Sequence, residues 1–242
     1  LAGSWEGQYT GSFNLFLQRL DNPAELSPIA FGQTLSEVVD IAPELSTFTF
    51  QAAAGDHVRL RMFDAGNNDF YPAAWLYRPD GTQVCYYLGD PVMDVECALD
   101  MDGGYTILAG SWEGQYTGSF NLFLQNLVAP GQVLPISYNH SLTNTISMPL
   151  EWHTYQFDGQ AGDPLSITIV RLDEALNTSL SLYRPDGSLL CASTSDQTRH
   201  TLRCTLDSTA TYTLLVGDSA GGVGSYELSV NRFLVMIPLV VH

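Results

Sequence analysis

The sequence contains no lysine, and its nine basic residues are all arginine. Against these stand 26 acidic residues, which leaves a formal net charge of −17. A surface of this sign repels phosphate backbones and anionic lipid headgroups. We therefore expect neither nucleic acid nor an acidic membrane surface as a partner.

Long apolar runs are also missing. Phe233–Val241 is a run of nine apolar residues, far short of the roughly 20 needed for a membrane-spanning helix. Charged residues make up only 14% of the chain, against roughly 25% in an average soluble domain. Because 45% of the residues are hydrophobic, a real core can form and intrinsic disorder is excluded. We expect no membrane span.

Cysteine is scarce, and its four residues form two local pairs, Cys85 with Cys97 and Cys191 with Cys204. No Cys-x2-Cys occurs and no histidine recurs at ligand spacing, which argues against a zinc site. We expect two disulfides, each joining the two strands of a hairpin near their bases. Disulfides persist in oxidising compartments, so we expect an extracellular or cell-surface protein.

An internal repeat organises the chain. The eighteen residues LAGSWEGQYTGSFNLFLQ occur at Leu1–Gln18 and again, unchanged, at Leu108–Gln125. A looser match continues, since Tyr77–Gly81 and Tyr183–Gly187 both read Tyr-Arg-Pro-Asp-Gly. We therefore divide the chain into unit A (21–126) and unit B (127–232). Residues 1–20 are expected to be a truncated third copy that holds only the two closing strands, and 233–242 an apolar tail strand.

The local pattern within each unit is β throughout. Ser46–Phe50, His57–Phe63, Ala73–Tyr77 and Tyr105–Ala109 are short, rich in β-branched or aromatic residues, and often alternate with period two. Pro-Asp-Gly is a turn sequence, and no window has a convincing amphipathic helix. About eight short strands per unit predict an all-β fold of tandem antiparallel β-sandwiches.

One order of motifs recurs in both units and resembles a known family. An aromatic-x-Phe strand is followed by Ala-Gly-Asp, Leu-Tyr-Arg-Pro-Asp-Gly, Tyr-Thr-Ile/Leu-Leu and Gly-Ser-Phe/Tyr-x-Leu. This order resembles the bacterial pre-peptidase C-terminal domain, a jelly-roll-like β-sandwich of secreted proteases and cell-surface proteins. The resemblance implies a non-catalytic accessory module. Some relatives hold structural calcium, but their ligand set does not map onto this sequence, so no calcium site is assigned. The matching residues are Phe48, Phe50, Gly55, Leu76, Tyr77, Pro79–Gly81, Tyr105 and Gly118–Phe120 in unit A, and Tyr155, Phe157, Gly162, Leu182, Tyr183, Pro185–Gly187, Tyr212 and Gly224–Tyr226 in unit B.

Gly217–Gly221 fits the Gly-x-Ser-x-Gly pattern of serine hydrolases. That motif requires a strand-to-helix turn, whereas here strand patterns lie on both sides. Two acidic stretches could ligate calcium: the first holds Asp90, Asp94, Glu96, Asp100 and Asp102, and the second is Asp64–Asp69. Unit B replaces most of the first stretch with uncharged or basic residues, which favours solvated loops. We expect no enzyme, no cofactor and no metal.

Trp5 and Trp112 lie in identical glycine-flanked loops. Such a ring packs over its own sandwich, anchors an interface or stacks on a sugar. Asn139 and Asn177 begin Asn-x-Ser/Thr sequons, a weak signal for glycosylation.

The two ends carry apolar residues that neither unit needs for its own core. Two explanations are open: the chain belongs to a longer tandem array, or its ends add strands to neighbouring molecules head to tail. The interface candidates are Trp5, Phe13, Leu15, Trp112, Phe233, Val235, Ile237 and Leu239.

These patterns favour a non-enzymatic extracellular structural protein, in which tandem sandwiches form a surface stalk, fibre or filament. The partners are then other subunits or flanking repeats. The alternative is an accessory module of a secreted hydrolase that binds polysaccharide or protein.

Overall fold

The computed structural model describes residues 10–21, 23, 26–66 and 70–232. Each unit contributes nine strands in the same order along the chain. In unit A these are β1 (Ser27–Pro28), β2 (Gln33–Val39), β3 (Ser46–Ala52), β4 (His57–Asp64), β5 (Pro72–Tyr77), β6 (Gln83–Leu88), β7 (Val92–Ala98), β8 (Gly103–Ser111) and β9 (Gly118–Asn126). In unit B they are β10 (Val133–Pro135), β11 (Ser141–Ile146), β12 (His153–Gly159), β13 (Pro164–Arg171), β14 (Thr178–Tyr183), β15 (Leu189–Ser195), β16 (Arg199–Thr205), β17 (Ala210–Asp218) and β18 (Gly224–Arg232).

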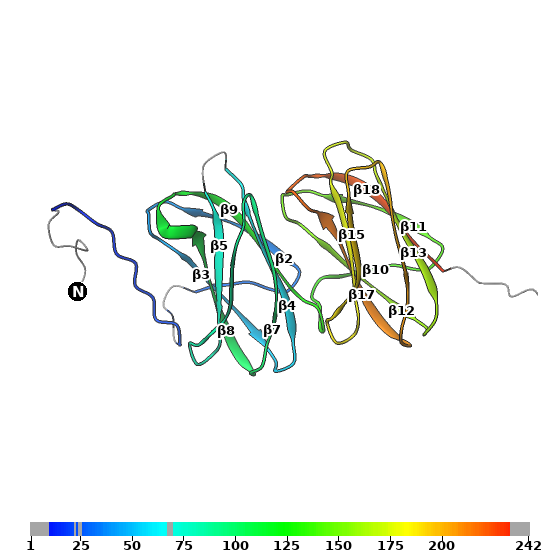
Figure 1. The fold of residues 1–242 in the computed structure, drawn as a ribbon, viewed down its shortest axis with the longest axis horizontal. Helices are drawn as coiled ribbons and strands as arrows, with labels where there is room; N and C mark the ends of the chain where they lie inside the picture. Colours follow the sequence, from blue (N-terminus) through cyan, green and yellow to red (C-terminus); the bar gives the residue numbers. More distant parts are fainter. Residues whose placement is uncertain (1–9, 22, 24–25, 67–69, 233–242) are drawn as a thin grey trace, which may run out of the picture.

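The strands of each unit form two sheets, which confirms the predicted all-β sandwich fold. Unit A has a five-stranded sheet β1-β3-β8-β5-β6 and a four-stranded sheet β2-β9-β4-β7. Unit B repeats this arrangement as β10-β12-β17-β14-β15 and β11-β18-β13-β16. Four sheet layers therefore follow one another along the long axis of the molecule (Figure 1).

The core of each sandwich lies between its two sheets, because successive side chains of a strand point to opposite faces. In β4, Val58, Leu60 and Met62 are buried in the core of unit A. The corresponding residues Leu165, Ile167 and Ile169 of β13 are buried in the core of unit B.

Two details differ from the sequence expectation. The short strands β1 and β10 pair in parallel with β3 and β12, so the sheets are not purely antiparallel. A 3₁₀ turn, η1 (Trp112–Gly114), also separates β8 from β9. Among the described residues, no helix is long and apolar enough to cross a bilayer.

The expected closing strands of residues 1–20 are not formed in the described part, Thr10–Leu20. This stretch runs beside unit A without a partner strand (Figure 1), and a strand needs such a partner for its backbone hydrogen bonds. Trp5, Phe233, Val235, Ile237 and Leu239 lie outside the described residues.

Candidate functional site

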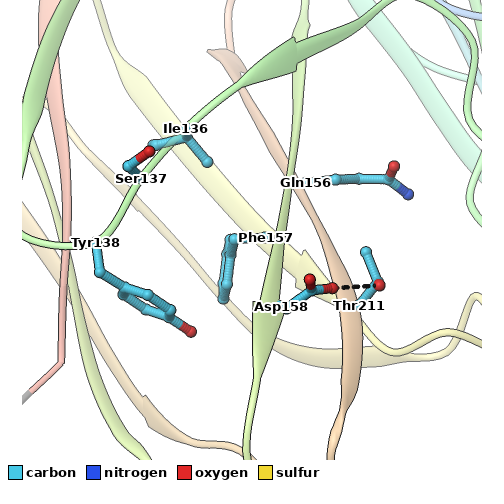
Figure 2. Close-up of a pocket in the computed structure, with 7 residues that line it drawn as sticks. All are labelled: Ile136, Ser137, Tyr138, Gln156, Phe157, Asp158 and Thr211. Atoms are coloured by element: carbon cyan, nitrogen blue, oxygen red, sulfur yellow. Dashed lines mark hydrogen bonds between the residues drawn. The ribbon is translucent and has the colours of Figure 1, made fainter.

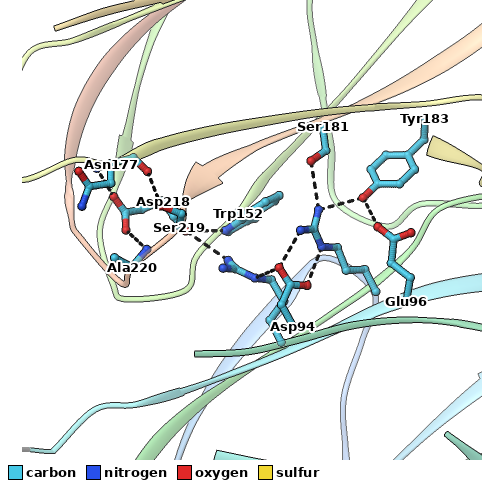
Figure 3. A network of polar contacts seen from close by, with 11 residues as sticks. Asp94, Glu96, Trp152, Asn177, Ser181, Tyr183, Asp218, Ser219 and Ala220 are labelled. Atoms are coloured by element: carbon cyan, nitrogen blue, oxygen red, sulfur yellow. Dashed lines mark hydrogen bonds and ion pairs between the residues drawn. The ribbon is translucent and has the colours of Figure 1, made fainter. Parts of the chain in front are cut away.

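The most elaborate group of polar contacts lies where the two units meet. The outer face of the sheet β2-β9-β4-β7 in unit A packs against the outer face of the sheet β10-β12-β17-β14-β15 in unit B (Figures 1 and 3). We call this contact the junction. It is centred on Arg59, Arg61 and Asp94 of unit A and on Trp152 and Tyr183 of unit B.

The alternation of β4 directs two arginines into the junction. Arg59 and Arg61 lie between the core residues of β4, so both point away from the core of unit A. Their side chains are only 12% and 2% exposed. Arginine is rarely buried to this degree without a charged partner, so the contacts of both guanidinium groups decide whether the junction is stable.

Asp94 provides that partner from the neighbouring strand β7. The register of the sheet places Asp94 opposite Arg61. Arg59 donates to both carboxylate oxygens, with Nε–Oδ1 2.8 Å and Nη2–Oδ2 2.7 Å. Arg61 Nε donates to Oδ2 at 3.0 Å. One carboxylate therefore holds two guanidinium groups on the same face of the sheet.

Groups of unit B accept the remaining hydrogen bonds that the structure gives for both arginines (Figure 3). Arg59 Nη1 donates to the Tyr183 hydroxyl at 2.8 Å and to Ser181 Oγ at 3.2 Å. Arg61 Nη1 donates to the Asp218 carbonyl oxygen at 3.3 Å. The Tyr183 hydroxyl in turn donates to Glu96 of unit A. The Tyr183 hydroxyl of unit B thus links Arg59 and Glu96, which both belong to unit A.

The indole of Trp152 covers the two cations. The guanidinium carbons of Arg59 and Arg61 each lie 4.4 Å from the centroid of the ring. Its Nε1 donates to the same Asp218 carbonyl oxygen that Arg61 uses, at 3.2 Å. A cation–π contact is strongest where the cation is desolvated, as both of these are.

An apolar cluster surrounds this polar centre. Phe123 of unit A packs with Leu127, Leu150, Trp152, Tyr183 and Leu215 of unit B, and all six are buried. Buried apolar area stabilises a contact by roughly 25 cal/mol per Å². It also limits the access of water to the two guanidinium groups, which strengthens their polar contacts.

The charges shift the ionisation of the groups that meet here. Burial opposes ionisation of Asp94, but the hydrogen bonds and charges of Arg59 and Arg61 outweigh it, so the pKa of Asp94 lies below its ordinary 3.8. Burial lowers the pKa of Arg61 to about 10. Burial also raises the pKa of Tyr183. At neutral pH the arginines are charged, Asp94 is ionised and Tyr183 keeps its proton.

Both predicted disulfides are present, Cys85–Cys97 and Cys191–Cys204, each with a Cα–Cα distance of 6.5 Å. The expected hairpin geometry is wrong, however. Cys85 lies on β6 and Cys97 on β7, and these strands belong to different sheets. Because β6 and β7 are edge strands of the two sheets, the disulfide joins the sheets of the sandwich at one side.

Unit A also carries a group of exposed or half-buried aromatic side chains: Trp75, Tyr86, Tyr87 and Trp112. The ring planes of Trp75 and Trp112 lie 17° apart with centroids at 6.3 Å. Trp112 therefore packs over its own sandwich while it stays 37% exposed. Tyr86 and Tyr87 on the edge strand β6 are each about half exposed, at 52% and 51%.

A hollow of about 510 Å³ lies on unit B beside Tyr138 and Phe157 (Figure 2). These two rings meet edge to face at 5.5 Å. The nearby carboxylate of Asp158 accepts a hydrogen bond from Thr211 at 2.6 Å, and burial raises the pKa of Tyr138 to about 12. Ile136, Ser137 and Gln156 complete the lining of this hollow.

The structure does not assemble the hydrolase motif. Ser219 Oγ donates to the backbone oxygen of Asn177 at 3.3 Å. The Asp218 carboxylate accepts the N–H groups of Ala220 and Gly222, each at 2.7 Å. The motif therefore forms a hydrogen-bonded turn. His200 lies against Ser193 and Thr178.

The acidic residues of unit A point to separate partners. Asp94 and Glu96 take part in the junction, Asp100 pairs with Arg78 at 2.7 Å, and Asp102 accepts from the N–H of Ala54. Within the described residues, no group of three or more such side chains is arranged to hold a metal ion.

The remaining candidates lie apart from the junction. Phe13 and Leu15 are 63% and 73% exposed. Asn139 is exposed in a left-handed turn with φ 60°. Asn177 is half-buried.

Sequence reasoning missed the arginines, Trp152 and Tyr183 as a functional group. The available signal was Arg-x-Arg in a strand whose copy in unit B reads Ser-x-Thr, at Ser166 and Thr168.

No family model matches the chain, and no curated protein sequence matches it. Among solved structures, the chain is similar to the pre-peptidase C-terminal domain of collagenase from Bacillus anthracis, with 16% identity over 42% of this chain and 97% of that domain and a TM-score of 0.35. It is also similar to PliG from Aeromonas hydrophila, a periplasmic inhibitor of g-type lysozyme, with 12% identity over 41% of this chain and 96% of that one and a TM-score of 0.32.

A longer match covers both units. It is the M60 catalytic domain of Clostridium perfringens ZmpB together with its CBM51-1 and CBM51-2 domains, at 7% identity and a TM-score of 0.31, over 83% of this chain and 34% of that one. The domain type that the sequence resembles is thus among the solved structures that are similar to this chain.

Proposed function

We propose that the chain is a non-catalytic, extracellular or cell-surface segment in which two β-sandwich modules form one rigid spacer. The observation that carries this proposal is the junction, where Asp94 binds Arg59 and Arg61, and Arg59 bonds Tyr183 of the other unit. If the units separated, two buried guanidinium groups would lose their contacts with unit B. Separation would also expose the apolar cluster to water, at a cost of roughly 25 cal/mol for each Å² of apolar area.

Most contacts between domains of one chain are polar enough to permit relative motion. The junction differs, since an apolar cluster surrounds its charges and Arg61 is only 2% exposed. The two disulfides support an oxidising compartment. None of the contacts among the described residues argues for assembly into a fibre or filament, and we do not propose it.

Small-angle scattering tests the rigidity. The variant replaces Arg59 by Ser, Arg61 by Thr and Asp94 by Thr, which are the residues that unit B carries at the corresponding positions Ser166, Thr168 and Thr201. We expect the unaltered chain to scatter as one rigid two-unit particle and the variant as two flexibly linked units.

The control is Arg78→Ser, which removes an exposed ion pair outside the junction and should leave the scattering unchanged. A flexible unaltered chain, or a variant as rigid as the parent, would contradict the proposal.

A second candidate function is the binding of polysaccharide or protein by the aromatic side chains of unit A. The observation in its favour is that unit B has Ser219 where unit A has Trp112, and Ala192 and Ser193 where unit A has Tyr86 and Tyr87. The rings are therefore not required by the sandwich itself. Exposed aromatic rings serve as contact platforms. Binding on a glycan array that Trp112→Ser abolishes would support this candidate, and an array without any signal would argue against glycans.

A further inference from the structure

The N-terminal segment (Thr10–Leu20) is hydrogen-bonded to unit A, and the residue that follows it, Asp21, approaches Gly81. Asn14 Nδ2 donates to the Ala42 carbonyl oxygen at 2.6 Å, and Gln18 Nε2 donates to Thr47 Oγ1 at 3.0 Å. Gly81 has no side chain at this point, and Asp21 lies next to it: a Cβ atom added to Gly81 would be 3.6 Å from Cβ of Asp21. The segment thus follows the outer face of the sheet β1-β3-β8-β5-β6.

The same contacts recur at the junction, where β9 of unit A meets unit B. Asn121 Nδ2 donates to the Pro149 carbonyl oxygen at 2.9 Å, and Gln125 Nε2 donates to Thr154 Oγ1 at 2.6 Å. Val128, the counterpart of Asp21, lies next to Gly187, the counterpart of Gly81: a Cβ atom added to Gly187 would be 3.0 Å from Cγ2 of Val128.

Each of these residues is the repeat counterpart of one that the N-terminal segment uses. The segment therefore occupies on unit A the place that β9 and the residues after it occupy on unit B.

The opposite side of the segment carries residues that belong in a core. Phe13, Leu15 and Leu17 are 63%, 73% and 89% exposed. Their counterparts in β9 are Phe120, Leu122 and Leu124, which are all 0% exposed in the core of unit A. Side chains along the segment alternate as in a strand of a sandwich. Asn14 and Gln18 contact unit A, and Phe13, Leu15 and Leu17 correspond to core residues.

The face of unit A under the segment resembles the face of unit B that the junction covers. Trp152 covers Gly217 in unit B, and Leu45 covers Gly110 in unit A. On the same strand face, unit A has Trp75 at the position of Ser181 in unit B. The face of unit A thus presents Trp75, which is stacked with Trp112, and the face of unit B presents Trp152. A tryptophan is what the paired arginines of unit A contact at the junction.

We infer that this face of unit A, together with the N-terminal segment, is the docking surface for a further β-sandwich unit of the same kind as unit A, for which Phe13–Gln18 serves as the last strand. This inference extends the proposed spacer by one unit in the N-terminal direction.

A second copy of this chain is a poorer occupant. Its unit A already has the required arginines engaged with its own unit B. Its unit B has Ser166, Thr168 and Thr201 in place of Arg59, Arg61 and Asp94. Continuity with the junction therefore favours a complete unit of type A over self-association.

The test is a chain in which a second copy of residues 21–107 is placed directly before residue 1. Because Leu1–Gln18 is identical to Leu108–Gln125, the added residues and the N-terminal segment together reproduce unit A from Asp21 to Gln125, with Arg19 in the place of Asn126. Residual dipolar couplings and small-angle scattering then report the folding and the orientation of the added unit. We expect a three-unit rod with one common alignment tensor and reduced quenching of Trp75 by iodide.

A triple variant in which Phe13, Leu15 and Leu17 become serine provides the matched comparison. In the three-unit chain it should unfold the added unit, because these side chains would fill its core. In the 242-residue chain it should leave the unfolding midpoint unchanged, since all three are exposed. An added unit that fails to fold on the unaltered segment, or that folds and tumbles independently, overturns the inference.

Self-association of the 242-residue chain through the segment would also overturn it. Each of these results leaves the A–B orientation measurable in the same sample, so failure of this inference and failure of the rigid spacer are distinguishable.

Discussion

Arg59 of unit A and Tyr183 of unit B, which are 124 positions apart in the sequence, meet at 2.8 Å across the junction. The tyrosine hydroxyl accepts from the guanidinium and donates to Glu96, so one oxygen links a cation and an anion of unit A. The Tyr183 hydroxyl of unit B thus makes hydrogen bonds with two side chains of unit A.

Replacing Tyr183 by Phe should weaken the junction without disturbing the sandwich of unit B. The ring stays in the apolar cluster, but Arg59 loses one acceptor and Glu96 one donor. We expect a loss of about 1–3 kcal/mol, measured by urea unfolding. Tyr77→Phe is the control, because Tyr77 is the half-buried counterpart in unit A and its change should stay within about 0.5 kcal/mol. Equal effects of the two substitutions would count against the assigned role of Tyr183.

Replacing Gln125 by Met should be costlier than the same change at Gln18. Gln125 is 0% exposed, and it bonds Thr154 Oγ1 as well as the N–H and the carbonyl oxygen of Gly131. Methionine fills a similar volume and leaves those groups unsatisfied, so we expect a loss of about 1–3 kcal/mol. Gln18→Met, at a half-buried position, should cost clearly less. Thermal unfolding of both variants gives the comparison, and the reverse order would contradict it.

Unit B should lose stability in mild acid. Burial lowers the pKa of His153 and of His200 below the ordinary 6.5. The unfolded chain therefore takes up these protons first as the pH falls, so stability is greatest above about pH 6.5 and declines below it until the folded pKa values are passed. Urea unfolding at pH 7.5 and pH 5.0 measures the change. His200→Asn should reduce the pH dependence, and an unchanged slope would exclude His200 as a contributor.

Removal of either disulfide should destabilise the unit that carries it. Each joins the edge strands of two different sheets, so its loss frees the sheets from each other at one side. Replacing Cys85 and Cys97 by serine should cost about 2–5 kcal/mol, seen as a lower unfolding midpoint. Reduction of the unaltered protein should lower the stability of both units. Insensitivity to a reductant would show that the sandwiches do not depend on these bonds.

The sandwich fold could be predicted from the sequence because its signals are local. Alternation such as that of His57–Phe63 and the Pro-Asp-Gly turns each act within a few residues, and the repeat shows that the pattern occurs twice. The short parallel strands escaped prediction, since Ser27–Pro28 and Val133–Pro135 are too short to show any period.

The junction could not be predicted because its contacts are long-range. Arg59 and Arg61 alternate with apolar residues, as polar residues do on the solvent-facing side of a strand. Nothing near them in the sequence identifies Trp152 as the side chain that covers them. The disulfide pairing was predictable from spacing, but its geometry was not, because Cys85 and Cys97 look like the two arms of one hairpin until the sheets are known.

The relative orientation of the two units tests the rigid spacer most directly. Residual dipolar couplings of backbone N–H groups, fitted separately for residues 26–126 and 127–232 of the unaltered chain, give an alignment tensor for each unit. We predict the same magnitude and orientation for both tensors, and two unequal tensors in the variant that lacks Arg59, Arg61 and Asp94. Unequal tensors in the unaltered chain would show that the units move independently, and would contradict the account.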